Sequence, residues 1–160
     1  MIVKLVVSVM LLGAVVMAQT PVKPTMEKTT KYAEKIHWAP SYQEGLKRAQ
    51  KEDKPFMFII SRHTCRYCVQ LEETALSDAE VIATLNEKFI ANTAYTDDND
   101  YFPQDLWNGG TPMIWFLLPN GEPMFQPIPG AIPTKDFKEA LAIVLKEYDS
   151  LKKPKTTKTK

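Results

Sequence analysis

The residues with the clearest chemical potential lie in the stretch SRHTCRYCVQ, at 61–70, which holds both cysteines of the chain, Cys65 and Cys68. Two thiols at this spacing can form a structural disulfide, act as a redox couple or bind a metal ion. A disulfide that closes a four-residue loop stabilises a fold by about 2 kcal/mol in the chain-entropy model, against about 4.7 kcal/mol for a 100-residue loop. A purely structural disulfide is therefore a weak explanation for the pair.

The redox interpretation requires the pair to lie at the start of a helix. Cys65 at a helix N-terminus would face unpaired backbone N–H groups and the positive end of the helix dipole, which both favour the thiolate. The neighbouring cation Arg66 is expected to tune the thiolate in the same direction. Cys68, one turn further along, is expected to be more buried. This interpretation makes Cys65 the nucleophile and Cys68 the resolving thiol of a thiol–disulfide oxidoreductase.

A metal site is the alternative use of the same stretch. His63, Cys65 and Cys68 would offer three ligands to copper or zinc, but a structural zinc requires a fourth. The other histidine, His37, has no matching spacing. Covalent haem attachment needs a histidine directly after the second cysteine, where this chain has Val69. A metal-binding or non-catalytic target-binding module thus remains the second hypothesis, whereas the oxidoreductase needs no cofactor and no resident metal.

The surrounding elements predict an α/β domain. A continuous apolar run, FMFIIS at 56–61, is typical of a buried central strand and leads directly into the cysteine stretch. Helices are expected from capping residues and helical spacing at 41–54, 67–76, 77–89 and 134–151. Ser41 is the expected N-cap of the first of these helices, and Ser77 is the expected N-cap of the third. Strands are expected at 89–96 and on both sides of the Asn-Gly turn within 111–130. This order predicts a central mixed β-sheet with helices on both faces.

Three blocks of the chain resemble the thioredoxin-like superfamily, in its extracytoplasmic, thiol–disulfide interchange branch. They are SRHTCRYCVQLEETALSDAEVIATLNEKFI (61–90), GGTPMIWFLLPNGEP (109–123) and Gly130. The resemblance covers about residues 38–150 and implies a thioredoxin-like fold. It also implies that Thr111 and the cis-proline Pro112 lie against the cysteines, where the Thr111 backbone can pair with an extended substrate chain. The substrate groove would include Thr64, Tyr67, Trp107 and Gly110.

Two departures from thioredoxin bear on the mechanism. Thioredoxin carries a buried acid in the strand before its first cysteine and a tryptophan directly before that cysteine, where this chain has Ile59 and Thr64. The resolving thiol is therefore left without an evident internal base. Glu72 and Glu73 follow in the helix, and we expect both to be solvated on its surface. The direction of electron transfer stays open: the resemblance favours a reductase, whereas Arg66 favours an oxidant.

The ends of the chain differ from the domain between them. Residues 1–18 have a charged start and an apolar run that ends in small residues, the layout of a secretory signal peptide cleaved after Ala18. An apolar run of this length is too short to cross a bilayer, which needs about 20 residues. We expect a polar linker at 19–36, the thioredoxin-like domain at 37–151 and a basic disordered tail at 152–160. The domain would then work in the periplasm or outside the cell, or on a membrane if the leader is not cleaved.

The composition sets limits on the partners. The chain is 44% hydrophobic and 24% charged with a formal net charge of +1, which gives no electrostatic basis for binding nucleic acid. The protein is expected to be a monomer. Its partners are expected to be thiols and disulfides of extracytoplasmic proteins and a membrane-bound electron donor.

Overall fold

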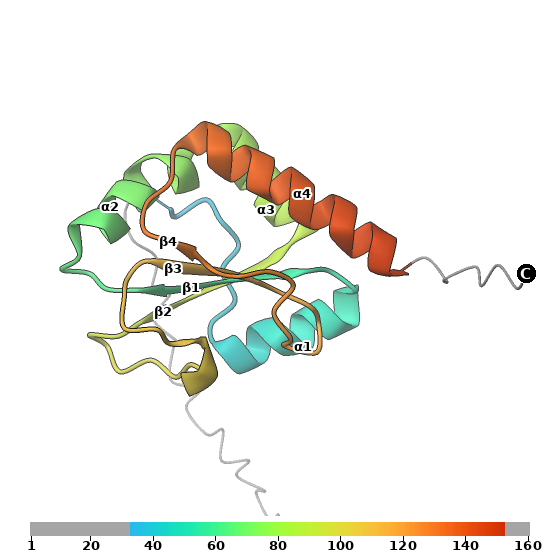
Figure 1. The fold of residues 1–160 in the computed structure, drawn as a ribbon, viewed down its shortest axis with the longest axis horizontal. Helices are drawn as coiled ribbons and strands as arrows, with labels where there is room; N and C mark the ends of the chain where they lie inside the picture. The colour runs from blue at the N-terminus through green and yellow to red at the C-terminus, as the bar shows by residue number, and fades with distance from the viewer. Residues whose placement is uncertain (1–32, 153–160) are drawn as a thin grey trace, which may run out of the picture.

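A four-stranded mixed sheet forms the centre of the protein, whose computed structural model describes residues 33–152 (Figure 1). The strands lie in the order β2-β1-β3-β4. Their bounds are β1 Phe56–Ser61, β2 Ile90–Tyr95, β3 Met113–Leu117 and β4 Ile128–Pro129. β1 pairs in parallel with β2 and antiparallel with β3, and β3 pairs antiparallel with β4. The expected signal peptide and nearly all of the expected tail lie outside the described residues.

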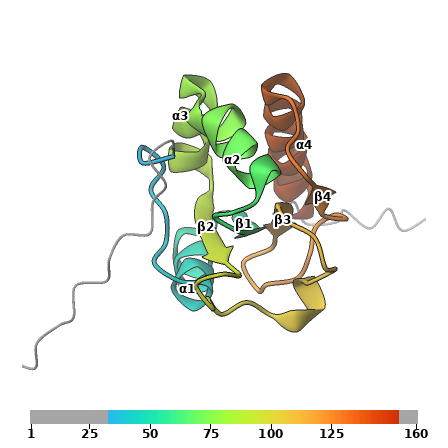
Figure 2. The same cartoon turned by 90° about the vertical axis from the view of Figure 1, so that its left-hand side faces the viewer.

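Helices cover both faces of this sheet (Figure 2). α1 lies on one face, and α2, α3 and α4 lie on the other. The helices run over Tyr42–Glu52 (α1), Arg66–Glu73 (α2), Ala79–Lys88 (α3) and Thr134–Lys152 (α4). Two 3-10 turns are added at Ala75–Ser77 (η1) and Gln104–Leu106 (η2). The predicted α/β class, with a thioredoxin-like mixed sheet between helices, is confirmed. None of the helices within 33–152 is long and apolar enough to span a membrane.

The central strand β1 is buried along its whole length because both of its faces are covered. Successive side chains of a strand point to opposite faces. Phe56, Phe58 and Ile60 accordingly join the apolar cluster under α1. Met57 and Ile59 join the second cluster, under α2, α3 and α4. An uninterrupted apolar run is the sequence pattern that this position requires.

Strand directions bring three loops to one edge of the sheet. Ser61, the last residue of β1, pairs with Tyr95, the last residue of β2. Ile60 pairs with Met113, the first residue of the antiparallel strand β3. The segments that follow β1 and β2 and the segment that precedes β3 therefore meet at this edge, which is where the cysteine stretch begins.

Two local predictions need correction. Ser41 caps α1 as expected, with its Oγ accepting a hydrogen bond from the Glu44 N–H at 3.2 Å. The expected N-cap Ser77 lies instead in η1, where its hydroxyl donates to the Glu72 carbonyl at 2.6 Å. Because η1 prolongs the preceding turn, α3 begins one residue later. Its N-cap is Asp78, whose carboxylate accepts from two backbone N–H groups.

The hairpin after β3 is also shorter than predicted. The Asn-Gly turn forms: the Asn120 side chain accepts from the Glu122 N–H at 3.0 Å, and Gly121 has a φ of 90°. Past the turn, however, the chain makes a single bridge at Pro123 before β4, which has only two residues. Prolines cannot donate to a ladder, and three of them, at 123, 127 and 129, interrupt this segment.

The packed domain begins before residue 37. Ala33 and Ile36, inside the segment expected to be a linker, are each only 2% exposed and belong to the core. Trp38 forms a parallel bridge with Ala91 of β2, and its indole N–H donates to the Ala33 carbonyl at 3.0 Å. This segment therefore covers the outer edge of β2.

The core on the α4 side should dominate stability. Phe137 is fully buried, so the Phe137→Ala variant is expected to lose about 3–5 kcal/mol of the free energy of unfolding. Ile143, on the same helix, is 51% exposed, and Ile143→Ala should change that free energy by no more than about 0.5 kcal/mol. Urea unfolding of both variants measures the difference. Equal losses in the two variants would contradict the described packing of α4.

Candidate active site

Cys65 is the N-cap residue of α2. Its Sγ accepts a hydrogen bond from the Cys68 N–H at 3.3 Å, so an unpaired N–H of the first helical turn points at the sulfur. On its other side the Cys65 thiol donates to the Thr111 carbonyl at 3.4 Å. Both cysteines are present as free thiols. The predicted placement of Cys65 at a helix start is confirmed.

These contacts make Cys65 the more acidic thiol. Burial by itself raises the pKa of Cys65, but hydrogen bonds from the side chains of Cys68 and Thr111 lower it. The backbone N–H groups of Cys68 and Tyr67 lower it further, and the net result is a pKa below the ordinary value of a thiol. Cys65 is also partly exposed. It therefore combines access to solvent with a stabilised thiolate, as a nucleophile requires.

Cys68 has the opposite properties. It is 1% exposed, and burial is the main reason that the pKa of its thiol is raised above the ordinary value. A hydrogen bond to the Cys65 sulfur raises that pKa further, whereas one with Ser61 opposes the rise. A protonated, inaccessible second thiol matches the predicted resolving role.

The loop before β3 supplies the surface next to Cys65. The Thr111–Pro112 peptide bond is cis, the geometry implied by the family resemblance. The Pro112 carbonyl accepts from the Gly130 N–H at 2.8 Å, which ties this loop to β4. Gly110 donates its N–H to the Asn108 side chain. The backbone of Thr111 is thus held beside the Cys65 sulfur, where the resemblance implies that it can pair with an extended substrate chain.

Arg66 lies in the first turn of α2, but its side chain is directed at Tyr67. Its Nη2 donates to the Tyr67 hydroxyl at 2.8 Å, and its guanidinium carbon lies 4.8 Å from the centre of that ring. Tyr67 itself is 50% exposed. The predicted tuning of the Cys65 thiolate by Arg66 therefore stays a prediction, because the contacts of the guanidinium are with the tyrosine.

Thr64 and Trp107 complete the residues expected in the groove. Thr64 is exposed and directly precedes Cys65. Trp107 is half-buried and packs on Phe102 with the ring centres 5.8 Å apart, as part of the cluster on the α1 side. Their contribution to substrate binding stays a prediction. Trp115 and Phe116 of β3 are buried in the core.

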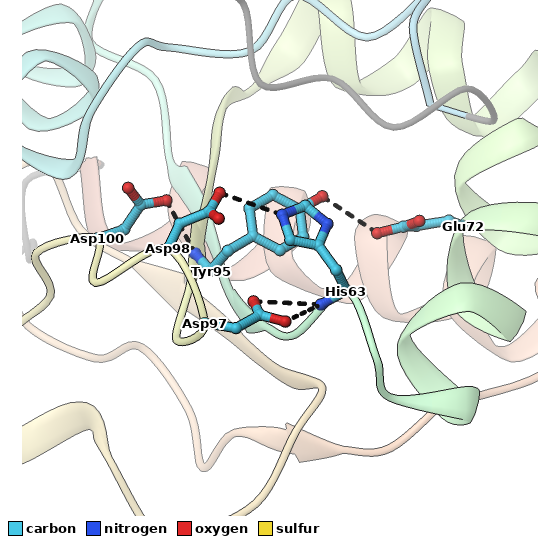
Figure 3. Close-up of polar contacts among 6 residues, drawn as sticks. All are labelled: His63, Glu72, Tyr95, Asp97, Asp98 and Asp100. Atoms are coloured by element: carbon cyan, nitrogen blue, oxygen red, sulfur yellow. Dashed lines mark hydrogen bonds and ion pairs between the residues drawn. The ribbon is translucent and has the colours of Figure 1, made fainter.

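His63 has partners that its sequence position does not reveal (Figure 3). Its ring stacks on Tyr95 with the centres 3.9 Å apart, its Nε2 lies 3.1 Å from Asp98, and its backbone N–H donates to Asp97. Within residues 33–152, the cluster of three groups able to hold a metal consists of His63, Asp97 and Asp98 and includes neither cysteine. The set of His63 with both cysteines, on which the metal hypothesis rested, is therefore not assembled.

The expectation that Glu72 and Glu73 are both solvated is only half right. Glu73 is exposed. Glu72, however, is 7% exposed, and its Oε1 accepts from the Tyr95 hydroxyl at 3.2 Å (Figure 3). Its spacing of four residues from Cys68 was the available signal, because residues at i and i+4 share a helix face. A glutamate on that face is buried against the sheet together with the resolving thiol.

The family follows from comparison with known proteins. Residues 42–145 match the family described as Thioredoxin-like domain. The match spans more than half of the chain and includes both cysteines and Pro112, so the chain belongs to the thioredoxin-like family, and the predicted resemblance is confirmed.

Individual relatives are more distant. The chain is 30% identical to Anterior gradient protein 2 of Xenopus laevis over 105 residues, which cover 59% of this chain and 57% of the relative. It is 29% identical to Anterior gradient protein 3 of Homo sapiens over 100 residues, covering 61% and 58% of the two chains. The chain thus spans about half the length of the curated relatives it matches.

Solved structures agree with the fold. A thioredoxin from Thermus thermophilus is 24% identical with a TM-score of 0.62, covering 79% of this chain and 99% of that chain. The C-terminal domain of DsbD from Neisseria meningitidis, in its oxidised form, is 21% identical with a TM-score of 0.50, covering 63% and 90%. At these identities the likeness concerns the fold.

The two thiols should differ in their reaction with iodoacetamide. Because the pKa of Cys65 is lowered and that of Cys68 is raised, Cys65 should be alkylated at pH values where Cys68 remains protonated. In Cys68→Ala the Cys65 sulfur loses a hydrogen bond, so the pKa of Cys65 should rise, whereas Cys68→Ser keeps a donor and should change it less. Alkylation rates against pH, followed by mass spectrometry, measure this. A Cys65 profile that is unchanged in Cys68→Ala would contradict the assignment.

Proposed function

We propose that this protein is a thiol–disulfide oxidoreductase that acts on other proteins through the Cys65–Cys68 couple. One observation carries the proposal: Cys65 is a partly exposed N-cap thiol with a lowered pKa, held against the backbone of Thr111. A thiolate in this position attacks disulfides, and the adjacent backbone offers a docking strand. Membership of the thioredoxin-like family supports the same chemistry.

The reaction proceeds through two exchanges. The Cys65 thiolate attacks one sulfur of a substrate disulfide, so that a Cys65–substrate bond forms while the substrate S–S bond breaks, and the released sulfur leaves as a thiolate that takes up a proton. Cys68 then loses its proton and attacks the Cys65 sulfur. The Cys65–Cys68 disulfide forms, and the second substrate sulfur leaves with the electron pair. The substrate has gained two electrons, which a dithiol donor must return to the protein.

Substrate recognition would use the backbone at Thr111. An extended chain that pairs with this backbone places its own disulfide beside Cys65, and main-chain hydrogen bonds of this kind tolerate many sequences. The exposed ring of Tyr67, at the start of α2, adds an apolar contact next to the nucleophile. The substrates are therefore proposed to be unfolded or extended protein segments rather than one small molecule.

The cellular setting is part of the proposal. The leader-like layout of residues 1–18 supports export to the periplasm or beyond, where disulfides form and persist. In that setting a membrane-bound donor would keep Cys65 and Cys68 reduced. We therefore propose the reducing direction, with the protein acting as a monomer on extracytoplasmic disulfides.

Trapping the intermediate tests the chemistry. With a model substrate that contains a disulfide, Cys68→Ser should accumulate a mixed disulfide between Cys65 and the substrate, because the resolving thiol is absent. Cys65→Ser should form none, since Cys68 is 1% exposed and protonated. Non-reducing electrophoresis with mass spectrometry identifies the adduct. If purified wild-type protein neither reduces nor oxidises a model disulfide, with or without a dithiol donor, the proposed activity is refuted.

A redox titration tests the direction. A reductant of this family should have a potential near that of thioredoxin, about −270 mV, whereas an oxidant should lie nearer to about −120 mV. Equilibration of the Cys65–Cys68 couple with glutathione or dithiothreitol buffers, read out by alkylation and mass, gives the value. A result at the oxidising end would reverse the proposed direction and leave the two-cysteine chemistry intact.

A further inference from the structure

A small cavity lies between α2 and the sheet, directly behind the resolving thiol. Its volume is about 10 Å³, close to the smallest that holds one water molecule. The polar side chains in its wall include those of Ser61, Cys68, Glu72 and Tyr95. A cavity with several hydrogen-bonding groups in its wall suits a bound water, whereas a purely apolar cavity of this size stays dry.

Its polar groups come from two elements that face each other. Cys68 and Glu72 are one helical turn apart on α2, so their side chains are neighbours. Ser61 and Tyr95 are paired in the β1–β2 register on the sheet side. The Tyr95 hydroxyl donates to the Glu72 carboxylate at 3.2 Å, and Ser61 hydrogen-bonds Cys68. The carboxylate is thus held in place at the wall that it shares with the thiol.

The proposed reaction requires a proton acceptor at this place. Burial raises the pKa of the Cys68 thiol, so at neutral pH Cys68 must lose its proton as it attacks. The strand position where thioredoxin has a buried acid is Ile59, which is 1% exposed and lines the same cavity. A carboxylate is nevertheless present in the wall, because Glu72 reaches it from α2.

We infer that the Glu72 carboxylate accepts the proton of Cys68, through one water in this cavity, during resolution of the mixed disulfide. The inference rests on the proposed function. In this step the Cys68 S–H bond breaks and Glu72 becomes protonated, the Cys68–Cys65 bond forms, and the Cys65–substrate bond breaks with its electron pair leaving on the substrate sulfur. Tyr95 is a positioning residue, since it acts through the carboxylate.

Within residues 33–152, the ionisable groups that line the cavity together with Glu72 come from α2 and β2. Cys68 faces it from α2, with Cys65 beyond, and Tyr95 faces it from β2. His63 covers the far side of the Tyr95 ring and is bound to Asp98 (Figure 3). A pH profile that depends on Glu72 therefore needs a control at Tyr95, whose hydroxyl donates a hydrogen bond to its carboxylate.

Stopped-flow reaction of the reduced protein with a chromogenic aromatic disulfide separates the two exchanges. The first release of aromatic thiol, by Cys65, depends on reagent concentration, whereas the second, by Cys68, does not. We expect Glu72→Gln to slow the second release about 100-fold at neutral pH, a typical contribution of a general base. Its rate should then rise in proportion to hydroxide. The first release should be unchanged, and the exposed neighbour variant Glu73→Gln should match wild type in both.

The Tyr95→Phe variant gives a second, independent readout. Losing the hydroxyl removes a hydrogen bond from the carboxylate, so the acid-side inflection of the second release should move to higher pH. If Glu72→Gln retains the wild-type rate and pH profile, or if it does not fold and Tyr95→Phe leaves the inflection in place, the inference is overturned. A wild-type protein that shows no first release would instead refute the proposed function, so the two failures are distinguishable.

Discussion

The mixed pairing of β1 is the constraint on which the site depends. One parallel and one antiparallel neighbour place the end of β1, the end of β2 and the beginning of β3 at the same edge of the sheet. The loop from β1 starts α2 at Cys65, and the peptide before β3 presents Thr111 to its sulfur. The segment after β2 supplies Asp97 and Asp98 to His63. A shift of one residue in either pairing would separate these groups and move the side chains of β1 from one covered face of the sheet to the other.

Two thiols one helical turn apart acquire opposite properties from their positions alone. Cys65 lies where backbone N–H groups lack helical partners, and these groups stabilise its negative charge. Cys68 lies one turn inside, where burial disfavours the same charge. The acid that would assist Cys68 is absent from β1 and is instead on α2 as Glu72. The nucleophile, the resolving thiol and the nearby carboxylate are therefore carried by one helix, with the sheet providing the wall against which they act.

Local patterns were sufficient for most of the fold and for the cysteine pair. The apolar run of β1 and the capping residue Ser41 are short-range signals, and both led to correct elements. The errors at the site depended on contacts between distant parts of the chain. The burial of Glu72 depends on Tyr95, and the stacking of His63 depends on the same tyrosine, more than twenty residues further along the chain in each case. The spacing of Glu72 from Cys68 indicates a shared helix face, but the hydrogen bond that Glu72 makes there depends on Tyr95 from β2.

The segment that covers the edge of β2 lies ahead of the part of the chain that matches the family, which begins at residue 42. Ala33 and Trp38 nevertheless form part of the wall of the cavity behind Cys68. The residues around Cys68 thus extend beyond the span of the family match. A chimera cut at residue 42 would therefore carry both cysteines but lack part of the wall of the cavity behind Cys68.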